Sequence, residues 1–257
     1  MHTMYCFKHP FRRTKCLFWV IILIFIGCEE PVSPTVKLDS ALITHFTLIQ
    51  EGKTGSARVR IRQRIEEKGE SAQPLFLMGL SYHKEKKYTK AADWFERAAK
   101  FDLPEDQYPP TWHFLGWSYY YLGEIEKSTR AFETFLSIQP NEGDSFFALG
   151  LLAMDSGDRI AAKEYYKKSI AFQQDNPKGQ AKAMARLGDV LVVDNPNAAR
   201  EMYLQSLSLD PDLYEAWYRL AKTYKQNDAE LFQKYLQKSK EAKLRVTQKK
   251  HNTSFPE

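Results

Sequence analysis

The chain has 257 residues, of which 43% are apolar, 14% aromatic and 27% charged. This composition supplies enough apolar surface for a sizeable core, and it excludes a disordered or collagen-like chain. The formal net charge of +5 comes largely from residues 1–27, because 33 basic and 32 acidic residues remain once that segment is removed. We therefore expect no nucleic-acid partner.

The amino-terminal segment has the pattern of a secretion signal. Residues 1–15 carry four basic and no acidic side chains, and the apolar run that follows reaches Cys28 before the polar pair Glu29-Glu30. As a helix this run would be about 20 Å long, which is shorter than the roughly 30 Å hydrocarbon layer of a bilayer. The pattern predicts a signal peptide over residues 1–27, with an uncleaved membrane anchor as the alternative.

The end of this segment, Phe25-Ile26-Gly27-Cys28, resembles the lipobox of bacterial lipoproteins. The resemblance implies that Cys28 is acylated, with palmitate or a similar fatty acid, and that the protein is anchored in a membrane of the bacterial cell envelope and faces the periplasm. Glu29 after the cysteine favours the outer membrane. No cysteine follows Cys28, so a disulfide framework is excluded. We expect residues 28–37 to form an extended tether.

A spacing of i, i+3, i+4 and i+7 recurs through the middle of the chain. It is complete in Trp112, Leu115, Gly116 and Tyr119. Related sets begin at Leu75, Phe146, Met184 and Trp217. These positions lie on one stripe of an α-helix, and a Gly or Ala inside the stripe allows a neighbouring helix to approach closely.

This pattern, followed by a second apolar helix and a proline, resembles the tetratricopeptide repeat, a helix-turn-helix unit of 34 residues. The resemblance implies an all-α fold, an α-solenoid wound as a right-handed superhelix. We expect a degenerate first hairpin over residues 38–70, the repeat array over 71–227, a capping helix over 228–247 and a disordered tail over 248–257. Gly123 and Gly157 are predicted to end first helices, and Pro140 and Pro211 to separate units. Insertions are predicted at residues 103–108 and 173–177.

The sequence contains no constellation typical of catalysis. It lacks the nucleophile, zinc and phosphate-binding motifs of common enzymes, and no histidine has a second ligand at helical spacing. We therefore predict that the protein is not an enzyme and has no metal, no cofactor and no small-molecule substrate. His83 and His113 are expected to line a surface.

A binding surface is the remaining prediction. In a stack of hairpins the first helices line the concave side, and the free face is rotated by about one residue from the packing stripe. The residues expected on this aromatic groove are Phe76, Leu80, His83, His113, Trp117, Tyr120, Phe147, Leu151 and Met154. An extended segment or an amphipathic helix of a protein partner is the expected guest. The alternative is that some of these side chains pack against the next unit.

Four arginines, at every second position from Arg58 to Arg64, make one end of the chain basic. We expect a solvated helix face with intrahelical pairs to Glu66 and Glu67. The alternative is a surface held near anionic lipid by the acyl anchor.

These observations predict a lipid-anchored adaptor or scaffold that positions another envelope protein. Its organisation is similar to that of pilotins, which guide secretin subunits to the outer membrane. Two alternatives stay open. One is an accessory or sensory module that regulates a partner enzyme, and the other is a membrane-anchored scaffold whose amino-terminal anchor is not cleaved.

Overall fold

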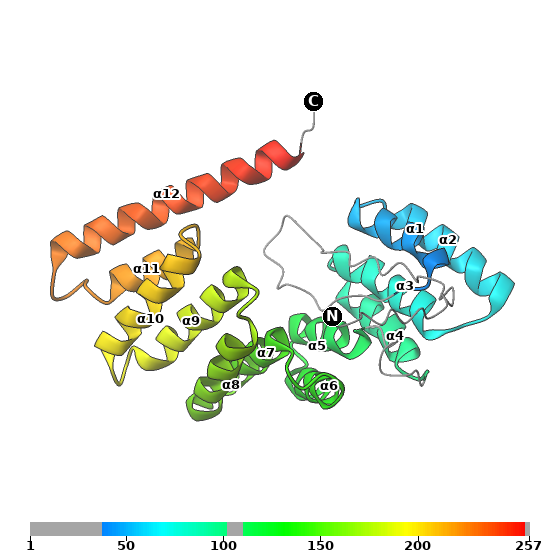
Figure 1. The fold of residues 1–257 in the computed structure, drawn as a ribbon, viewed down its shortest axis with the longest axis horizontal. Coiled ribbons are helices and arrows are strands. Elements are labelled where there is room, and N and C mark those ends of the chain that lie inside the picture. The colour runs from blue at the N-terminus through cyan, green and yellow to red at the C-terminus, as the bar shows by residue number, and fades with distance from the viewer. Residues whose placement is uncertain (1–37, 102–109, 255–257) are drawn as a thin grey trace, which may run out of the picture.

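The computed structural model describes residues 38–101 and 110–254, which form twelve helices and no strand. The helices are α1 (Ser40–Gln50), α2 (Thr54–Lys68), α3 (Ala72–Lys84), α4 (Tyr88–Ala98), α5 (Thr111–Leu122), α6 (Ile125–Ile138), α7 (Gly143–Asp155), α8 (Arg159–Phe172), α9 (Pro177–Leu191), α10 (Pro196–Leu209), α11 (Tyr214–Lys222) and α12 (Ala229–Ser254). Consecutive helices pair as hairpins, and the hairpins follow one another along an arc (Figure 1). The predicted α-solenoid is confirmed.

The first hairpin of the array lies where it was predicted, whereas the last helix is longer than predicted. Helices α1 and α2 form a hairpin within residues 38–70, and Ala57 and Ile61 are buried at its contact with the next unit. At the other end α12 continues to Ser254, so the helix extends past the predicted end at residue 247. The signal peptide, Cys28, the tether and the insertion at residues 103–108 lie outside the described residues.

Each complete hairpin is held together by a glycine on its first helix and an aromatic ring on its second. A Cβ atom on Gly116 would lie 2.8 Å from the ring of Phe132, and one on Gly150 would lie 2.4 Å from the ring of Tyr166. The same pairing joins Gly79 to Phe95 and Gly188 to Tyr203. The four rings are fully or almost fully buried, so the small position of the repeat is required for close packing.

Two helices end at the predicted glycines, and two others begin at asparagine caps that were not predicted. Gly123 follows α5 with φ +75° and Gly157 follows α7 with φ +80°, a left-handed conformation that glycine adopts without steric cost. Asn176 and Asn195 cap α9 and α10, each accepting a backbone N–H of the first turn. Pro140 lies between α6 and α7. The chain therefore turns at each unit for local reasons.

The predicted intrahelical pairing of the arginines on α2 is wrong. Arg58 pairs with Glu85 at 2.8 Å and Arg64 pairs with Asp39 at 3.2 Å, so both reach across to other segments. Glu85 follows α3 in the next hairpin, and Asp39 precedes α1. The spacing of residues along α2 alone cannot predict partners on other segments. Within residues 38–101 and 110–254, no helix has the length and apolar character needed to cross a bilayer.

Candidate binding groove

A groove opens between α7 and α9 and is completed by side chains of α5 and α11. Its cavity volume is about 220 Å³. The lining residues are Trp117, Tyr120, Tyr121, Asp144, Phe147, Leu151, Gln173, Gly179, Lys182, Ala185, Arg186, Leu213, Glu215 and Arg219. Because α5, α7, α9 and α11 are the first helices of four consecutive hairpins, the groove lies on the side of the solenoid that the repeat pattern predicts.

One wall of this groove is aromatic and comes from α5 and α7. The indole of Trp117 contacts Tyr120 edge-on at 5.5 Å between ring centroids and is stacked with Tyr121 at 5.9 Å. Phe147 and Leu151, one turn apart on α7, extend the wall and are half-buried. Aromatic walls of this kind anchor apolar side chains of protein partners at little conformational cost.

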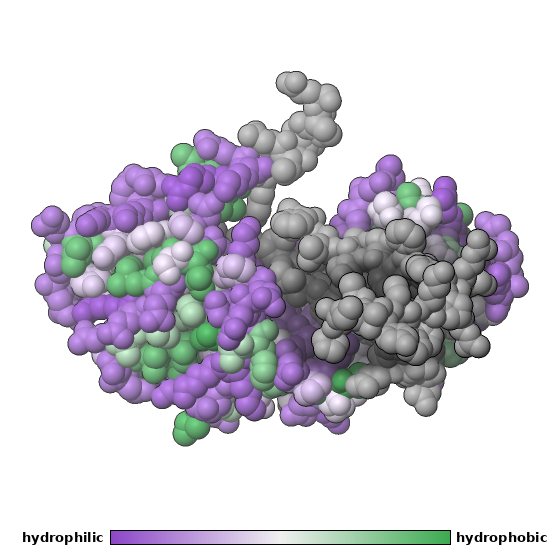
Figure 2. Space-filling view, viewed as in Figure 1, coloured by the Kyte–Doolittle hydropathy of each residue, from purple (hydrophilic) through white to green (hydrophobic). Residues whose placement is uncertain are grey.

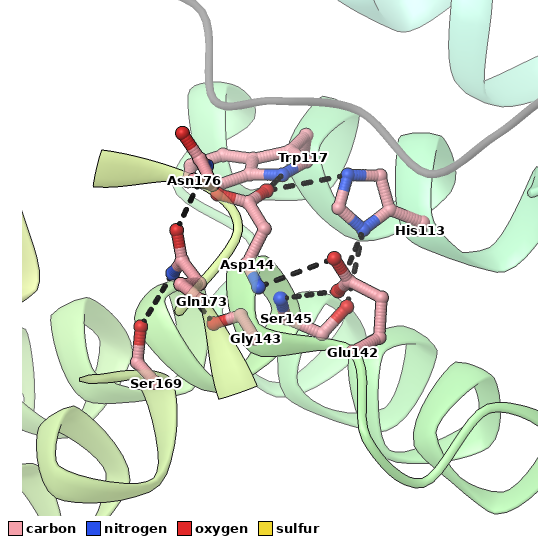
Figure 3. A network of polar contacts seen from close by, with 9 residues as sticks. All are labelled: His113, Trp117, Glu142, Gly143, Asp144, Ser145, Ser169, Gln173 and Asn176. Atoms are coloured by element: carbon pink, nitrogen blue, oxygen red, sulfur yellow. Dashed lines mark hydrogen bonds and ion pairs between the residues drawn. The ribbon is translucent and has the colours of Figure 1, made fainter. Parts of the chain in front are cut away.

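A buried cluster of two acids and a histidine lies beside the groove, and its member Asp144 forms part of the groove floor (Figure 3). Trp117 Nε1 donates to Asp144 Oδ2 at 3.1 Å. His113 lies between the two carboxyl groups, with Nε2 3.4 Å from Asp144 Oδ2 and Nδ1 3.6 Å from Glu142 Oε2. Glu142 caps α7 by accepting the backbone N–H groups of Asp144 and Ser145. The cluster thereby connects the aromatic wall to the start of α7.

Burial controls the protonation of this cluster. Burial raises the pKa of Asp144 well above its ordinary value, and the neighbouring Glu142 carboxyl raises it further. Burial also raises the pKa of Glu142, against the hydrogen bonds from Ser145 and Asp144 that lower it. The pKa of His113 falls to about 3 because the ring is completely enclosed. The low-dielectric surroundings thus favour neutral forms of these side chains.

Gln173 lies at the predicted insertion between α8 and α9, and its hydrogen bonds fix the position of α9 relative to α8 (Figure 3). Its Nε2 donates to the carbonyl of Gly143 at 3.0 Å and to Ser169 Oγ at 2.6 Å, and its Oε1 accepts from Asn176 at 3.1 Å. A Cβ atom on Gly179 would lie 1.7 Å from Gln173 Oε1. The connection between α8 and α9 is therefore fixed by the hydrogen bonds of Gln173. It sets the distance between the groove walls formed by α7 and α9.

The opposite wall is cationic and comes from α9 and α11. Lys182 and Arg186 are one helical turn apart on α9, and Arg219 reaches in from α11. Asp189 pairs with both arginines, with Arg219 Nε at 2.9 Å and Arg186 Nη1 at 3.3 Å. The groove therefore combines an apolar wall and a basic wall, and neither Asp144 on α7 nor the cations on α9 were predicted.

The structure places the nine predicted groove residues in three groups. Four line the groove: Trp117, Tyr120, Phe147 and Leu151. Phe76, Leu80, His83 and His113 are between 0% and 6% exposed and, unlike the 5% exposed Trp117, do not line the groove, so the prediction that they line an accessible surface is wrong. Met154 is half-buried and packs beside α8 and α9, away from the groove lining.

The physical reason is close packing between successive first helices. Phe76 on α3 contacts Phe114 on α5 at 5.7 Å between ring centroids, and His83 contacts the same ring at 5.6 Å. Rotation by one residue from the packing stripe therefore points to the next unit along α3 and at His113 of α5, and to the groove from Trp117 of α5 onward and along α7. His83 also bonds Ser118 Oγ at 3.0 Å, which satisfies its ring in the core.

Comparison with known proteins agrees with this architecture. The model of the tetratricopeptide repeat family matches residues 72–103, 109–142 and 143–176, which are three consecutive units. The chain contains tetratricopeptide repeats, and its fold is an α-solenoid of these repeats. Such repeats are modules that bind protein or peptide partners, and no catalytic family is indicated.

Several solved structures share the fold at low sequence identity. The structure of Pseudomonas aeruginosa pilF matches with a TM-score of 0.65 and 18% identity, over 77% of this chain and 87% of that chain. A chain of the APC/C hetero-tetramer Cut9-Hcn1 gives the same TM-score of 0.65 at 18% identity over 78% of this chain, which spans only 39% of the matched chain.

YrrB, described as a TPR protein with an unusual peptide-binding site, matches with a TM-score of 0.54 and 18% identity over 76% of this chain and 98% of its own. At these identities the likeness concerns the fold alone. Among residues 38–101 and 110–254, no group of three or more His, Cys, Asp or Glu side chains is arranged to hold a metal ion.

Proposed function

We propose that this protein is a lipid-anchored adaptor of the bacterial cell envelope that binds a segment of another protein in the groove between α7 and α9. One observation carries the binding role, namely the aromatic wall of Trp117, Tyr120, Phe147 and Leu151 on the inner side of the solenoid. The groove volume of about 220 Å³ suits one or two side chains of a guest segment and is below that of a typical small-molecule site.

The envelope location and a pilotin-like role in assembling an envelope complex are parts of the same proposal. They are supported by the basic segment, the short apolar run and the lipobox-like sequence that ends at Cys28. An acyl chain would hold the adaptor at a membrane while the solenoid binds its partner. The measurement is labelling with a radioactive fatty acid of the native protein and of a Cys28→Ala variant. Equal labelling of both would contradict the anchor.

Site-specific photo-crosslinking tests the binding role. A photoreactive phenylalanine derivative is placed at Leu151, which lines the groove, and in a matched protein at Ile160, which is 82% exposed on α8 and does not line it. We expect a discrete crosslinked partner from position 151 only. Tyr120→Glu should abolish that product, whereas Tyr218→Glu, a substitution of a 48% exposed tyrosine outside the groove, should leave it. Identical products from positions 151 and 160 would refute the groove.

A further inference from the structure

We infer that the segment bound in this groove carries an acidic side chain next to an apolar one, with the carboxylate on Lys182 and Arg186 and the apolar group against Trp117 and Phe147. This inference rests on the proposed function, because it names the chemistry of the guest at the same groove. Its basis is the way in which the two walls differ in charge.

The first step concerns the charge balance of the basic wall. Asp189 is one carboxylate shared between Arg186 and Arg219, and it also accepts the hydroxyl of Tyr203 at 2.9 Å. Lys182 has no hydrogen bond or ion pair with the part of the chain that the structure describes. The wall therefore keeps positive charge that Asp189 does not neutralise, and the side chain of Arg186 is 40% exposed and accessible to a guest.

The second step concerns the acids that line the same groove. Asp144 is 4% exposed and is held by the Trp117 indole, so its carboxyl is part of the floor. Its raised pKa, caused first by burial, keeps it from offsetting the cations fully. One carboxylate oxygen of Glu215 is also buried. Asp144 is thus set back from the opening and one oxygen of the half-buried Glu215 is enclosed, whereas the Arg186 side chain is 40% exposed.

The third step concerns the distance between the walls. Asp144 and Lys182 both line the cavity, and Asp144 also accepts the indole N–H of Trp117 on the aromatic side. The two walls therefore line one cavity, which holds only one or two side chains. Successive side chains of an extended segment point in opposite directions, so two neighbouring residues of a guest can contact the two walls. Figure 2 shows apolar patches, separated by hydrophilic residues, over the part of the molecule formed by α9, α10 and α11.

The test uses the full chain and short fluorescent peptides with acetylated and amidated ends. Each peptide has a Gly-Ser background and one Leu-Phe pair, followed by Asp, Asn or Lys, and binding is measured by fluorescence anisotropy at low and at physiological salt. We expect the Asp peptide to bind about fivefold more tightly than the Asn peptide, the Lys peptide to bind most weakly, and the difference to shrink with salt. A fourth peptide replaces the Asp side chain by a free terminal carboxylate.

Charge reversal identifies the residues responsible. In a Lys182→Glu, Arg186→Glu variant the order of the Asp and Lys peptides should invert. A Lys234→Glu, Lys240→Glu variant changes the net charge by the same amount on the exposed side of α12 and should keep the original order. Because the α9 side chains are partly exposed, circular dichroism should show unchanged helix content. Lys182→Gln, which removes one charge without adding another, should halve or further reduce the preference for Asp.

Three outcomes would overturn the inference. Equal affinity for the Asp, Asn and Lys peptides, or a preference for the free terminal carboxylate, would show that the groove does not select an acidic side chain. Failure of all peptides to bind while Leu151 still crosslinks a partner would refute the guest chemistry and leave the proposed function standing. Loss of the crosslink as well would refute the proposed function itself.

Discussion

Histidine 83 shows how the interior of this solenoid constrains a titratable side chain. Its ring is 5% exposed, bonds Ser118, and packs among Tyr88, Phe95 and Phe114. Burial lowers its pKa from 6.5 to about 4. Between pH 6.5 and about 4, His83 is therefore mostly neutral in the folded protein and mostly protonated in the unfolded chain.

The first prediction concerns pH and His83. The unfolded chain binds more protons than the folded one between pH 6.5 and about 4, so stability is intact above pH 6.5 and is lost as the pH falls through this window. At about 1.4 kcal/mol per pKa unit, the wild type should lose about 3 kcal/mol more on acidification than a His83→Asn variant, which keeps an atom near Nδ1 for Ser118. Urea unfolding at pH 7 and pH 4 measures the difference.

Equal losses in the two proteins would contradict the assignment. His83 is better suited to this test than His113, because Glu142 and Asp144 titrate beside His113 and their raised pKa values give the opposite slope. Acids that hold protons more tightly when folded favour the folded state at low pH, whereas the buried imidazoles disfavour it there.

At the same scale, the groove could be predicted from sequence only in part. Phe147 and Leu151 follow from the one-residue rotation along α7, because the groove opens beside that helix. Phe76 follows the same rule and is buried, because α5 covers α3. Asp144 and Lys182 come from helices of different hairpins, and no local spacing connects them. Their proximity depends on the connection fixed by Gln173, which appears in the sequence only as an irregular spacing.

The helices themselves were the most predictable level of organisation. The small residue of each stripe predicts close packing, and Gly116 and Gly150 meet the rings of Phe132 and Tyr166. The end of α12 was less predictable, since residues after 247 lack apolar periodicity and the helix still continues to Ser254. Gln248, Lys249 and Lys250 are good helix formers, which favours continuation past residue 247, whereas His251 to Ser254 are weaker ones.

Part of the attachment of α12 to α11 is a strip of contacts around Ala242, beyond the packing of Tyr235 on Trp217 and Tyr224. Ser239 Oγ donates to the carbonyl of Tyr214 at 2.8 Å, and Arg245 Nε donates to Asp212 at 2.8 Å. Between them Ala242 is completely buried. The helix is therefore held by an aromatic side chain in its first part, by small side chains near its centre and by charged ones beyond.

The second prediction concerns this strip. Ala242→Asp should weaken the docking of α12 by about 3 kcal/mol or more, because a short charged side chain is placed where water has no access. Leu244→Asp is the matched control on the same helix, since Leu244 is 58% exposed, and it should stay within about 0.5 kcal/mol of the wild type apart from helix propensity. Limited proteolysis of α12 measures the difference. Comparable cleavage of the two variants would contradict the assigned contact.

Across the whole molecule the core is a series of clusters along the arc. One cluster spans α1 to α6, another is centred on α5 and α7, and a third joins α9, α10 and α11. Each unit contacts mainly its neighbours, so stability is expected to be local and to be summed along the chain. The repeat pattern predicts this architecture, but the curvature and the groove depend on contacts between units.

The third prediction concerns this locality. Leu220→Ala removes a fully buried side chain from the cluster of α9, α10 and α11 and should cost about 2–5 kcal/mol there. Hydrogen exchange followed by mass spectrometry should show faster exchange in α9 to α12 and unchanged protection in α3 and α4. Leu75→Ala, in the cluster of α1 to α6, should give the reverse pattern. Uniform acceleration in either variant would indicate one cooperative unit.

The glycine and its ring belong to the same hairpin in every complete unit, from Gly79 with Phe95 to Gly188 with Tyr203. A hairpin that is duplicated, exchanged or inserted therefore keeps both partners of its own packing contact. The contacts of Gln173 differ in this respect, because they join two units: Gln173 contacts Gly143 of one unit and Gly179 of the next. Gene duplication can thus lengthen the solenoid on either side of these two units while leaving the spacing of the groove walls unchanged.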